Sequence, residues 1–218
     1  MTDALTYDAL NAQLSAAPVV PLVGEGDPDR AVGTARALGE GGLQVIEVVM
    51  RSPGALSSME AIRAQTRGLT VGAGTVLTLD QAKTVVERGA QFIVSPGLVE
   101  DIVAFCRDNG IPCLPGTMTP SEVQRAHAMG LRAVKFFPAS LAGGVPMLKA
   151  LGAVFRDMRF MPTGGIGPDN LADYLALPQV IACGGSWLTP TDAIEEEDFE
   201  TVTELARKAL AIAGKRRD

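Results

Sequence analysis

Eight short apolar runs, separated by segments with helical spacing, constrain the fold of this chain more than any other feature. A run of about four to eight apolar residues bounded by turn residues is typical of a strand buried on both faces. Strands of this kind that alternate with helices are expected to be parallel and joined by right-handed crossovers. The runs span residues 19–23, 45–50, 70–76, 92–96, 111–115, 133–138, 159–163 and 180–183.

The number of runs favours a closed barrel over an open sheet. Eight units in 218 residues leave about 27 residues for each, barely enough for a strand, a helix and two short loops. An open doubly wound sheet usually has about five or six strands, so eight units fit a (β/α)8 barrel better. We therefore predict an α/β protein that forms a single (β/α)8 TIM barrel with an extra N-terminal helix.

No linker, block of charge or change in composition divides the chain, so we predict one domain over residues 1–218. Within it we expect an N-terminal helix in residues 1–17, the barrel core in residues 18–190 and a C-terminal helix in residues 191–218. Residues 3–16 have the spacing of a helix that covers the bottom of the barrel. Residues 195–215 are predicted as the last helix, acidic at its beginning and basic at its end, as the helix dipole favours.

Proline in the first helical turn, after a capping residue, marks the predicted beginnings of four helices. The four dipeptides are Asp27-Pro28, Ser52-Pro53, Thr119-Pro120 and Gly167-Pro168. Two further helices are predicted from amphipathic spacing over residues 78–88 and 99–109, each ending before a glycine.

The composition excludes several kinds of partner. Hydrophobic residues make up 47% of the chain and charged residues 20%, which is enough apolar material for a packed core. The formal net charge of −6 provides no overall field that would attract nucleic acid or an anionic membrane surface. No apolar stretch reaches the roughly 20 residues that span a bilayer, and the first residues lack the pattern of a secretory signal. We therefore expect no nucleic-acid and no membrane partner.

Cysteine and histidine usage narrows the chemistry further. Cys106, Cys113 and Cys183 lack CxxC spacing, which argues against a disulfide framework and for a reducing compartment, so we predict a cytoplasmic protein. We expect these three cysteines to be small buried hydrophobic residues. The single histidine, His127, lies in a helical stretch and is expected at a surface or a helix interface. One histidine is too few for a His-rich zinc or iron site, so no metal site is predicted.

Lys135 is the most informative polar residue, because it alone of five lysines lies in the middle of a predicted strand. Burying an ammonium group costs free energy unless the pKa of the amine falls or an anion pairs with it. An amine with a lowered pKa can attack a carbonyl group and form a Schiff base. The other interpretation is a structural ion pair inside the barrel, and the position of Lys135 leaves both open.

Glu47 is the matching carboxylate. Strand alternation places Glu47, Val49 and Arg51 on one face, and Glu47 in the second strand would face Lys135 in the sixth across the barrel. A carboxylate near the amine can move protons during carbonyl chemistry, and Arg51 can hold a substrate carboxylate with its planar guanidinium. A buried network of these charges without chemistry is the alternative.

Two glycine pairs follow the last two predicted strands, where barrel enzymes usually bind phosphate. They are Gly164-Gly165 and Gly184-Gly185, and Ser186 follows the second pair. Paired glycines let backbone N–H groups approach phosphate oxygens, and the Ser186 hydroxyl can donate another hydrogen bond. Turns need glycine for other reasons, so the evidence lies in the two pairs together.

Two further strand ends carry candidate pocket residues. Gly72 and Gly74 are expected to serve tight packing of the barrel, whereas Thr75 and Pro96, nearer the rim, are expected to line a small carboxylate pocket. Trp187 fits either the beginning of the last helix of the barrel or a subunit contact, and the sequence does not decide between them.

These motifs, in this order between about residues 19 and 190, resemble the class I 2-keto-3-deoxy-6-phosphogluconate aldolases, a family that includes 4-hydroxy-2-oxoglutarate aldolases. The lysine motif and the ordered set are specific, whereas a single glycine motif is not. The motifs are Ile46-Glu47-Val48 with Arg51, Gly72-Ala73-Gly74-Thr75, Ser95-Pro96-Gly97, Lys135-Phe136-Phe137-Pro138-Ala139, Pro162-Thr163-Gly164-Gly165 and Gly184-Gly185-Ser186-Trp187.

The resemblance implies a reversible cleavage of 2-keto-3-deoxy-6-phosphogluconate to pyruvate and D-glyceraldehyde 3-phosphate, with no cofactor and in a homotrimer. It implies Lys135 as the Schiff-base lysine and Glu47 as the proton shuttle. The remaining implied roles are pyruvate binding by Arg51, Thr75, Pro96 and Phe137, hydroxyl binding by Thr163, and phosphate binding by Gly164, Gly165, Gly185 and Ser186. One departure is Val49, where many relatives have threonine, so recognition of a hydroxyl group or the rate is expected to differ.

Several alternatives stay open at this point. Within the resemblance, the better substrate could be 4-hydroxy-2-oxoglutarate or the galactonate-derived isomer 2-keto-3-deoxy-6-phosphogalactonate. Outside it, another phosphate-binding barrel enzyme, such as an indole-glycerol-phosphate-type synthase or a sugar-phosphate isomerase, would form no stable Schiff base. A non-catalytic barrel that binds phosphorylated ligands would show no turnover.

Overall fold

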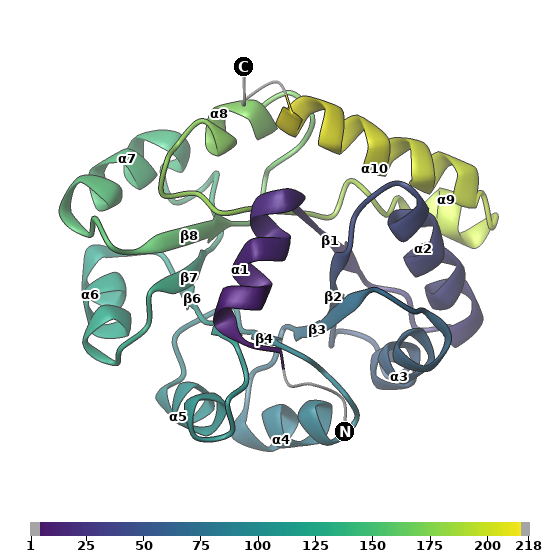
Figure 1. Cartoon of the computed structure of the whole chain (residues 1–218), viewed down its shortest axis with the longest axis horizontal. Coiled ribbons are helices and arrows are strands. Elements are labelled where there is room, and N and C mark those ends of the chain that lie inside the picture. The colour runs from purple at the N-terminus through teal and green to yellow at the C-terminus, as the bar shows by residue number, and fades with distance from the viewer. Residues whose placement is uncertain (1–4, 215–218) are drawn as a thin grey trace.

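The computed structural model describes residues 5–214, in which parallel strands are surrounded by helices (Figure 1). Strand residues occur in all eight predicted apolar runs. The described residues form nine strands because the fifth run continues past Pro115, which has no N–H group for a ladder, into a second short strand. The strands are β1 (Val19–Val23), β2 (Val45–Val49), β3 (Thr70–Gly74), β4 (Ile93–Val94), β5 (Cys113–Leu114), β6 (Gly116–Thr117), β7 (Ala133–Phe136), β8 (Arg159–Pro162) and β9 (Cys183–Gly185).

Every strand pairing is parallel, as the alternation of strands and helices predicts. One sheet has the order β5-β4-β3-β2-β1-β9, and a second has the order β6-β7-β8. Two single bridges, Phe160 with Val180 and Thr163 with Gly184, join β8 to the segment that contains β9. The result is an α/β fold with a curled parallel sheet, and its strands all end on the same side.

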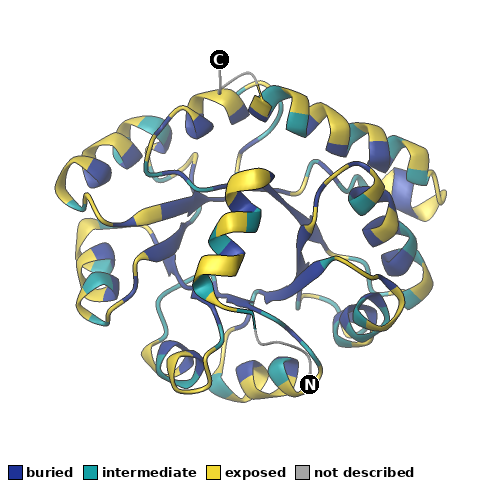
Figure 2. Ribbon diagram, in the orientation of Figure 1, coloured by how far each residue is buried: buried dark blue, intermediate teal, exposed yellow. Residues whose placement is uncertain are grey.

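The helices lie outside the strands and turn their buried faces toward them (Figure 2). The exception is α1, which lies across one end of the curled sheet, whose strands are referred to together as the ring of strands (Figure 1). The helices are α1 (Tyr7–Ala16), α2 (Pro28–Glu40), α3 (Ala55–Gln65), α4 (Leu79–Glu87), α5 (Glu100–Asp108), α6 (Pro120–Ala128), α7 (Gly144–Val154), α8 (Leu171–Leu175), α9 (Thr191–Glu195) and α10 (Phe199–Gly214).

Two of the four predicted helix beginnings are confirmed. The Asp27 carboxylate accepts hydrogen bonds from the first turn of α2, and Thr119 caps α6 in a capping box with Glu122. The other two are wrong, because Pro53 and Pro168 each occupy the second position of a turn that precedes the helix. Ala55 N–H donates to the Ser52 carbonyl in one turn, and Asn170 N–H donates to the Gly167 carbonyl in the other.

The predicted C-terminal helix is divided in two. Helix α9 ends at Glu195, Glu197 adopts a φ of 57°, and α10 begins at Phe199. A non-glycine residue in the left-handed region stops a helix, and the carboxylate of Asp198 then accepts a hydrogen bond from Thr201 N–H. The predicted N-terminal helix begins at Tyr7, capped by Thr6. Residues 1–4 and 215–218, which the predicted terminal helices include, lie outside the described residues.

Two apolar clusters form the core. The larger one lies between the strands and the surrounding helices. The inner cluster lies within the ring of strands, and Leu10 and Leu14 of α1 pack into it. It is completed by Val20, Val45, Phe92, Val94, Leu114, Ala133, Met161 and Ala182. Helix α1 therefore covers the amino-terminal end of the curled sheet, and the polar residues that follow in each strand lie toward the carboxyl end.

Candidate active site

Glu47, Lys135 and Thr163 are three buried polar residues that lie directly above the inner apolar cluster. Each comes two residues after a member of that cluster in its own strand segment, so alternation points all three into the ring. Glu47 is 0% exposed, Lys135 4% and Thr163 3%. Charged residues buried to this degree are rare unless they are paired, which makes this layer the candidate site.

Lys135 and Glu47 form an ion pair, as strand alternation predicts. Lys135 Nζ lies 3.4 Å from Glu47 Oε1, and it also lies 5.4 Å from the centre of the Phe137 ring. The other carboxylate oxygen, Glu47 Oε2, is buried and has no hydrogen-bond partner among the described residues. A buried acceptor without a partner is unfavourable, and it is available to a hydroxyl group or a water molecule in the site.

Glycines make room for the polar side chains of this layer. A Cβ atom at Gly74 would overlap the Glu47 carboxylate, and a Cβ atom at Gly184 would overlap the Thr163 hydroxyl. Gly72, in contrast, accommodates the ring of Phe92. The prediction that both glycines of β3 serve packing is therefore confirmed for Gly72, whereas Gly74 accommodates the carboxylate of Glu47.

Arg51 and Thr75 come together at the rim beyond β2 and β3. Arg51 is exposed, and its Nε–H donates a hydrogen bond to Thr75 Oγ1 at 3.2 Å. Arg51 does not continue the alternation of β2, because its own backbone N–H donates to the Val49 carbonyl in a turn. Thr75 has a φ of 58°, a left-handed conformation that is strained for threonine, and strained residues of this kind cluster at functional sites. Pro96 is half-buried at the same rim, after β4.

The two glycine pairs lie side by side at the ends of β8 and β9, because the Thr163–Gly184 bridge joins them. Gly164 and Gly165 adopt φ values of 98° and 73°, which glycine alone reaches at no steric cost. The second pair is required for a different reason, since Cβ atoms at Gly184 and Gly185 would meet the side chains of Thr163 and Trp187. Ser186 is exposed at the end of this loop.

Ser140 is a residue that sequence reasoning missed. It lies five residues after Lys135, and its N–H donates to the Gly164 carbonyl at 3.0 Å. A Cβ atom at Gly165 would overlap the Ser140 hydroxyl, so the two residues are in contact. The only signal in the sequence is a hydroxyl residue close behind the lysine motif, which is too common to be informative.

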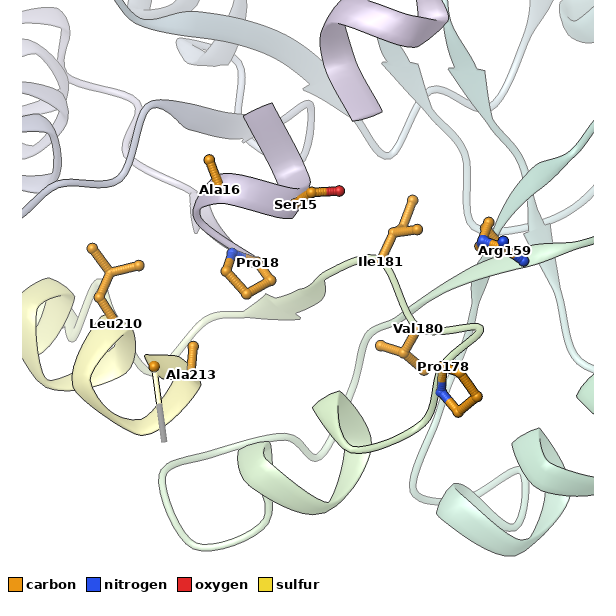
Figure 3. Close-up of a pocket in the computed structure, with 10 residues that line it drawn as sticks. Ser15, Ala16, Pro18, Arg159, Pro178, Val180, Ile181, Leu210 and Ala213 are labelled. Atoms are coloured by element: carbon orange, nitrogen blue, oxygen red, sulfur yellow. The ribbon is translucent and has the colours of Figure 1, made fainter. Parts of the chain in front are cut away.

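A small pocket of about 290 Å³ lies beside the site, between the loops after β1 and β9. Glu25 and Arg30 form an ion pair in its wall, with Arg30 Nε 3.1 Å from Glu25 Oε2. Burial opposes ionisation of Glu25, but hydrogen bonds from the Asp27 N–H and from Arg30 outweigh it and lower the Glu25 pKa. A larger pocket of about 470 Å³ lies at the opposite end of the strands, next to the end of α1, and does not include the candidate residues (Figure 3).

The remaining predictions concern residues away from the site. Cys106, Cys113 and Cys183 are buried, as predicted, and none of them forms a disulfide within the described residues. His127 lies at the surface of α6 and its Nε2 is 2.9 Å from Asp157 Oδ2, which lowers the Asp157 pKa. Within residues 5–214 there is no cluster of three or more His, Cys, Asp or Glu side chains placed to hold a metal ion. In the same part of the chain no helix combines the length and apolar character needed to cross a membrane.

A buried lysine beside a buried glutamate, at the carboxyl ends of parallel strands, agrees with the comparison to known families. Residues 10–205 match the family model described as KDPG and KHG aldolase. The chain therefore belongs to this aldolase family, which confirms the resemblance seen in the motifs.

Individual relatives are similar over most of their length. The 2-dehydro-3-deoxy-phosphogluconate aldolase of Treponema pallidum is 45% identical, over 90% of this chain and 93% of the relative. The KHG/KDPG aldolase of Escherichia coli K12 is 45% identical, over 90% of this chain and 92% of the relative. The KDPG aldolase of Legionella pneumophila, solved with pyruvate captured as a covalent carbinolamine intermediate, has a TM-score of 0.88 at 39% identity and covers 91% of this chain and 97% of its own.

Proposed function

We propose that this chain is a class I aldolase that cleaves 2-keto-3-deoxy-6-phosphogluconate reversibly to pyruvate and D-glyceraldehyde 3-phosphate. The observation that carries the proposal is the buried pair of Lys135 and Glu47, with Nζ and Oε1 3.4 Å apart. A structural ion pair alone leaves the buried Glu47 Oε2 without a partner. An aldolase uses that oxygen, because a carboxylate beside the amine can take and return protons.

In the proposed reaction, the amine of Lys135 attacks the C2 ketone of the substrate, and loss of water gives a protonated imine. The imine draws electrons from the C3–C4 bond. Glu47, directly or through a water molecule, removes the proton of the C4 hydroxyl group, and the C3–C4 bond breaks. The aldehyde leaves, the remaining enamine is protonated, and hydrolysis releases pyruvate and the free lysine. These steps need no metal and no organic cofactor.

The rim residues are assigned to the two ends of the substrate. Arg51 and Thr75, which hydrogen-bond one another, hold the carboxylate of the pyruvate half, and Pro96 and Phe137 pack beside it. Thr163 contacts the substrate hydroxyl groups, supported by its buried hydroxyl oxygen, which has no hydrogen-bond partner among the described residues. The phosphate is bound by the adjacent ends of β8 and β9, with Gly164, Gly165, Gly185 and Ser186 as its ligands.

We further propose that the curled sheet closes into a single (β/α)8 barrel of one domain, with α1 as an extra helix. The two bridges between β8 and the β9 segment support closure on one side, and the continuity of β5 and β6 through Pro115 supports it on the other. We also propose a cytoplasmic homotrimer. Leu77, Met118 and Leu141, in loops after β3, β6 and β7, are 51%, 43% and 86% exposed, and we assign these apolar side chains to the contact between subunits. Sedimentation of the purified protein tests the trimer.

Reduction with borohydride in the presence of pyruvate tests the aldolase proposal. We expect a pyruvate-derived adduct on the peptide that contains Lys135, located by mass spectrometry, and no adduct in Lys135→Ala. The matched control is Lys149→Ala, which removes an exposed lysine of α7 and should leave the adduct in place. Failure to trap pyruvate at any pH between about 6 and 9, where lysines activated by burial react, would reject a Schiff-base mechanism in favour of non-covalent phosphate chemistry or ligand binding alone.

A second candidate substrate is 4-hydroxy-2-oxoglutarate, which would yield pyruvate and glyoxylate. The 45% identity to a relative named KHG/KDPG aldolase favours it. The two substrates share the pyruvate half and the C4 hydroxyl group. Beyond C4, 4-hydroxy-2-oxoglutarate ends in a carboxylate, whereas 2-keto-3-deoxy-6-phosphogluconate carries a C5 hydroxyl group and a C6 phosphate, so the ratio of their kcat/KM values measures what the contacts beyond C4, including those of the β8 and β9 loops, contribute. Comparison with 2-keto-3-deoxy-6-phosphogalactonate tests the preference at C4.

A further inference from the structure

Trp187 is the only tryptophan of the chain, and the proposed mechanism gives it no role. It follows β9, directly after Ser186, and packs against the larger apolar cluster. Its indole nitrogen, Nε1, is buried and has no hydrogen-bond acceptor among the residues that the structure describes. A buried N–H group without an acceptor loses its hydrogen bond to water and gains none in the protein, which is unfavourable, so its position requires an explanation.

The indole nitrogen lies against the backbone of Gly185. A Cβ atom at residue 185 would be 2.8 Å from Trp187 Nε1, closer than real Cβ contacts allow. Gly185 does not adopt the positive φ found at Gly164 and Gly165, so its backbone conformation does not require glycine. Glycine is required at this position because the indole ring leaves no room for a Cβ atom. The N–H edge of the ring therefore occupies the space that a side chain at residue 185 would need.

This contact lies in the loop that faces the other glycine pair. Thr163 bridges to Gly184, which places the Gly185–Ser186 backbone beside Gly164 and Gly165. An anion held there would lie beside the Gly185–Ser186 backbone, toward which the indole turns the positive edge of its N–H dipole.

We propose that Trp187 is a positioning residue of the phosphate site, which fixes the Gly185–Ser186 backbone and adds the positive edge of its N–H dipole. The inference rests on the proposed function, since it concerns the site assigned to the substrate phosphate. Because Nε1 is buried, Trp187 acts through Gly185 rather than by touching the phosphate. It thereby favours phosphorylated over phosphate-free substrates.

Steady-state kinetics with both substrates tests this role. Trp187→Phe keeps an aromatic ring and removes the N–H group. We expect the ratio of kcat/KM for 2-keto-3-deoxy-6-phosphogluconate over 4-hydroxy-2-oxoglutarate to fall severalfold, less than the roughly tenfold loss of a direct hydrogen bond to a charged group, because Trp187 acts through the Gly185 backbone. The change should lie in KM rather than kcat. Ser186→Ala is the matched variant, and it should move the ratio in the same direction. An unchanged ratio in Trp187→Phe, including an equal loss on both substrates, overturns the inference.

Fluorescence gives an independent measurement, because Trp187 is the sole indole. Titration of the wild-type protein with inorganic phosphate should change its emission saturably, and Ser186→Ala should weaken the apparent affinity. No change in emission, at phosphate concentrations that inhibit cleavage competitively, contradicts the inference. If the protein cleaves neither substrate and traps no pyruvate, the proposed function fails by itself, and the emission titration alone then decides whether Trp187 senses an anion.

Discussion

The carboxylate of Glu47 occupies the space that a Cβ atom at Gly74 would fill. The two residues lie on neighbouring strands, where Val49 is the register partner of Gly74. The absence of a side chain in β3 is therefore what allows the carboxylate in β2 to lie beside Lys135.

Gly74→Ala should accordingly inactivate the enzyme without unfolding it. The added methyl group displaces the Glu47 carboxylate from Lys135, and loss of a positioned acid–base group lowers kcat by about 10²–10⁴-fold. The backbone at Gly74 has no positive φ, so alanine fits its conformation. Gly167→Ala, where a Cβ atom meets nothing within 4 Å, is the control and should retain activity. Equal kcat values for the two variants would contradict the assignment of Glu47.

Substitutions of Lys135 and Glu47 should have coupled effects on the free energy of unfolding. Lys135→Met leaves a buried carboxylate without its cation, and removal of one member of a buried pair typically costs about 3–5 kcal/mol. Adding Glu47→Gln removes the stranded charge, so the double variant should be more stable than Lys135→Met alone. Urea unfolding of the wild type, both single variants and the double variant measures this. Additive effects in this cycle would mean that the two side chains do not interact.

Arg51→Lys should weaken binding of the pyruvate half. Lysine keeps the charge but loses the planar pair of donors that matches a carboxylate, so we expect KM to rise about tenfold. Arg51 is exposed, so the free energy of unfolding should change little. The same factor is expected for both candidate substrates because they share the pyruvate half. A selective effect on the phosphorylated substrate would instead place Arg51 at the phosphate end.

Tyr7 should make the stability depend on pH in the alkaline range. Its hydroxyl donates to the Cys113 carbonyl at 2.8 Å and accepts from the Cys113 N–H at 2.7 Å, which ties α1 to β5. Burial raises the Tyr7 pKa above its ordinary value of 10.0. The neutral form therefore stabilises the fold fully below about pH 10, and this contribution is lost progressively as the pH rises above that value. Tyr7→Phe should be less stable at pH 8, and its difference from the wild type should shrink by pH 11.

Much of the fold could be predicted because the strands are buried on both faces. Such runs stand out in any sequence, and the inward position of Glu47 and Lys135 follows from alternation alone. The beginnings of α3 and α8 could not be predicted, because proline is favoured at the second position of a turn as well as in the first turn of a helix. The division between α9 and α10 depends on the left-handed φ of Glu197, for which glutamate gives no signal.

The residue types of the candidate site could be predicted from the sequence, whereas most contacts between their side chains could not. The interaction of Arg51 with Thr75 joins side chains 24 residues apart and depends on the turn after β2, which periodicity does not reveal. The sequence also did not reveal why glycine is needed at positions 184 and 185. Sequence reasoning treated them as backbone donors, whereas their immediate neighbours are the side chains of Thr163 and Trp187.

The placement of α1 determines from which end of the strands reactants reach Lys135. Leu10 and Leu14 fill the amino-terminal end of the ring of strands, and an apolar layer separates them from Lys135. Because this end is filled, reactants reach Lys135 from the carboxyl ends of the strands. In the proposed reaction the fragment attached to Lys135 lies innermost, so the aldehyde must depart before pyruvate can, and in the reverse direction pyruvate must arrive first. The covalent bond to Lys135 sets this order, whereas α1, which touches none of the reacting atoms, covers the amino-terminal end, so that both fragments use the carboxyl end of the strands.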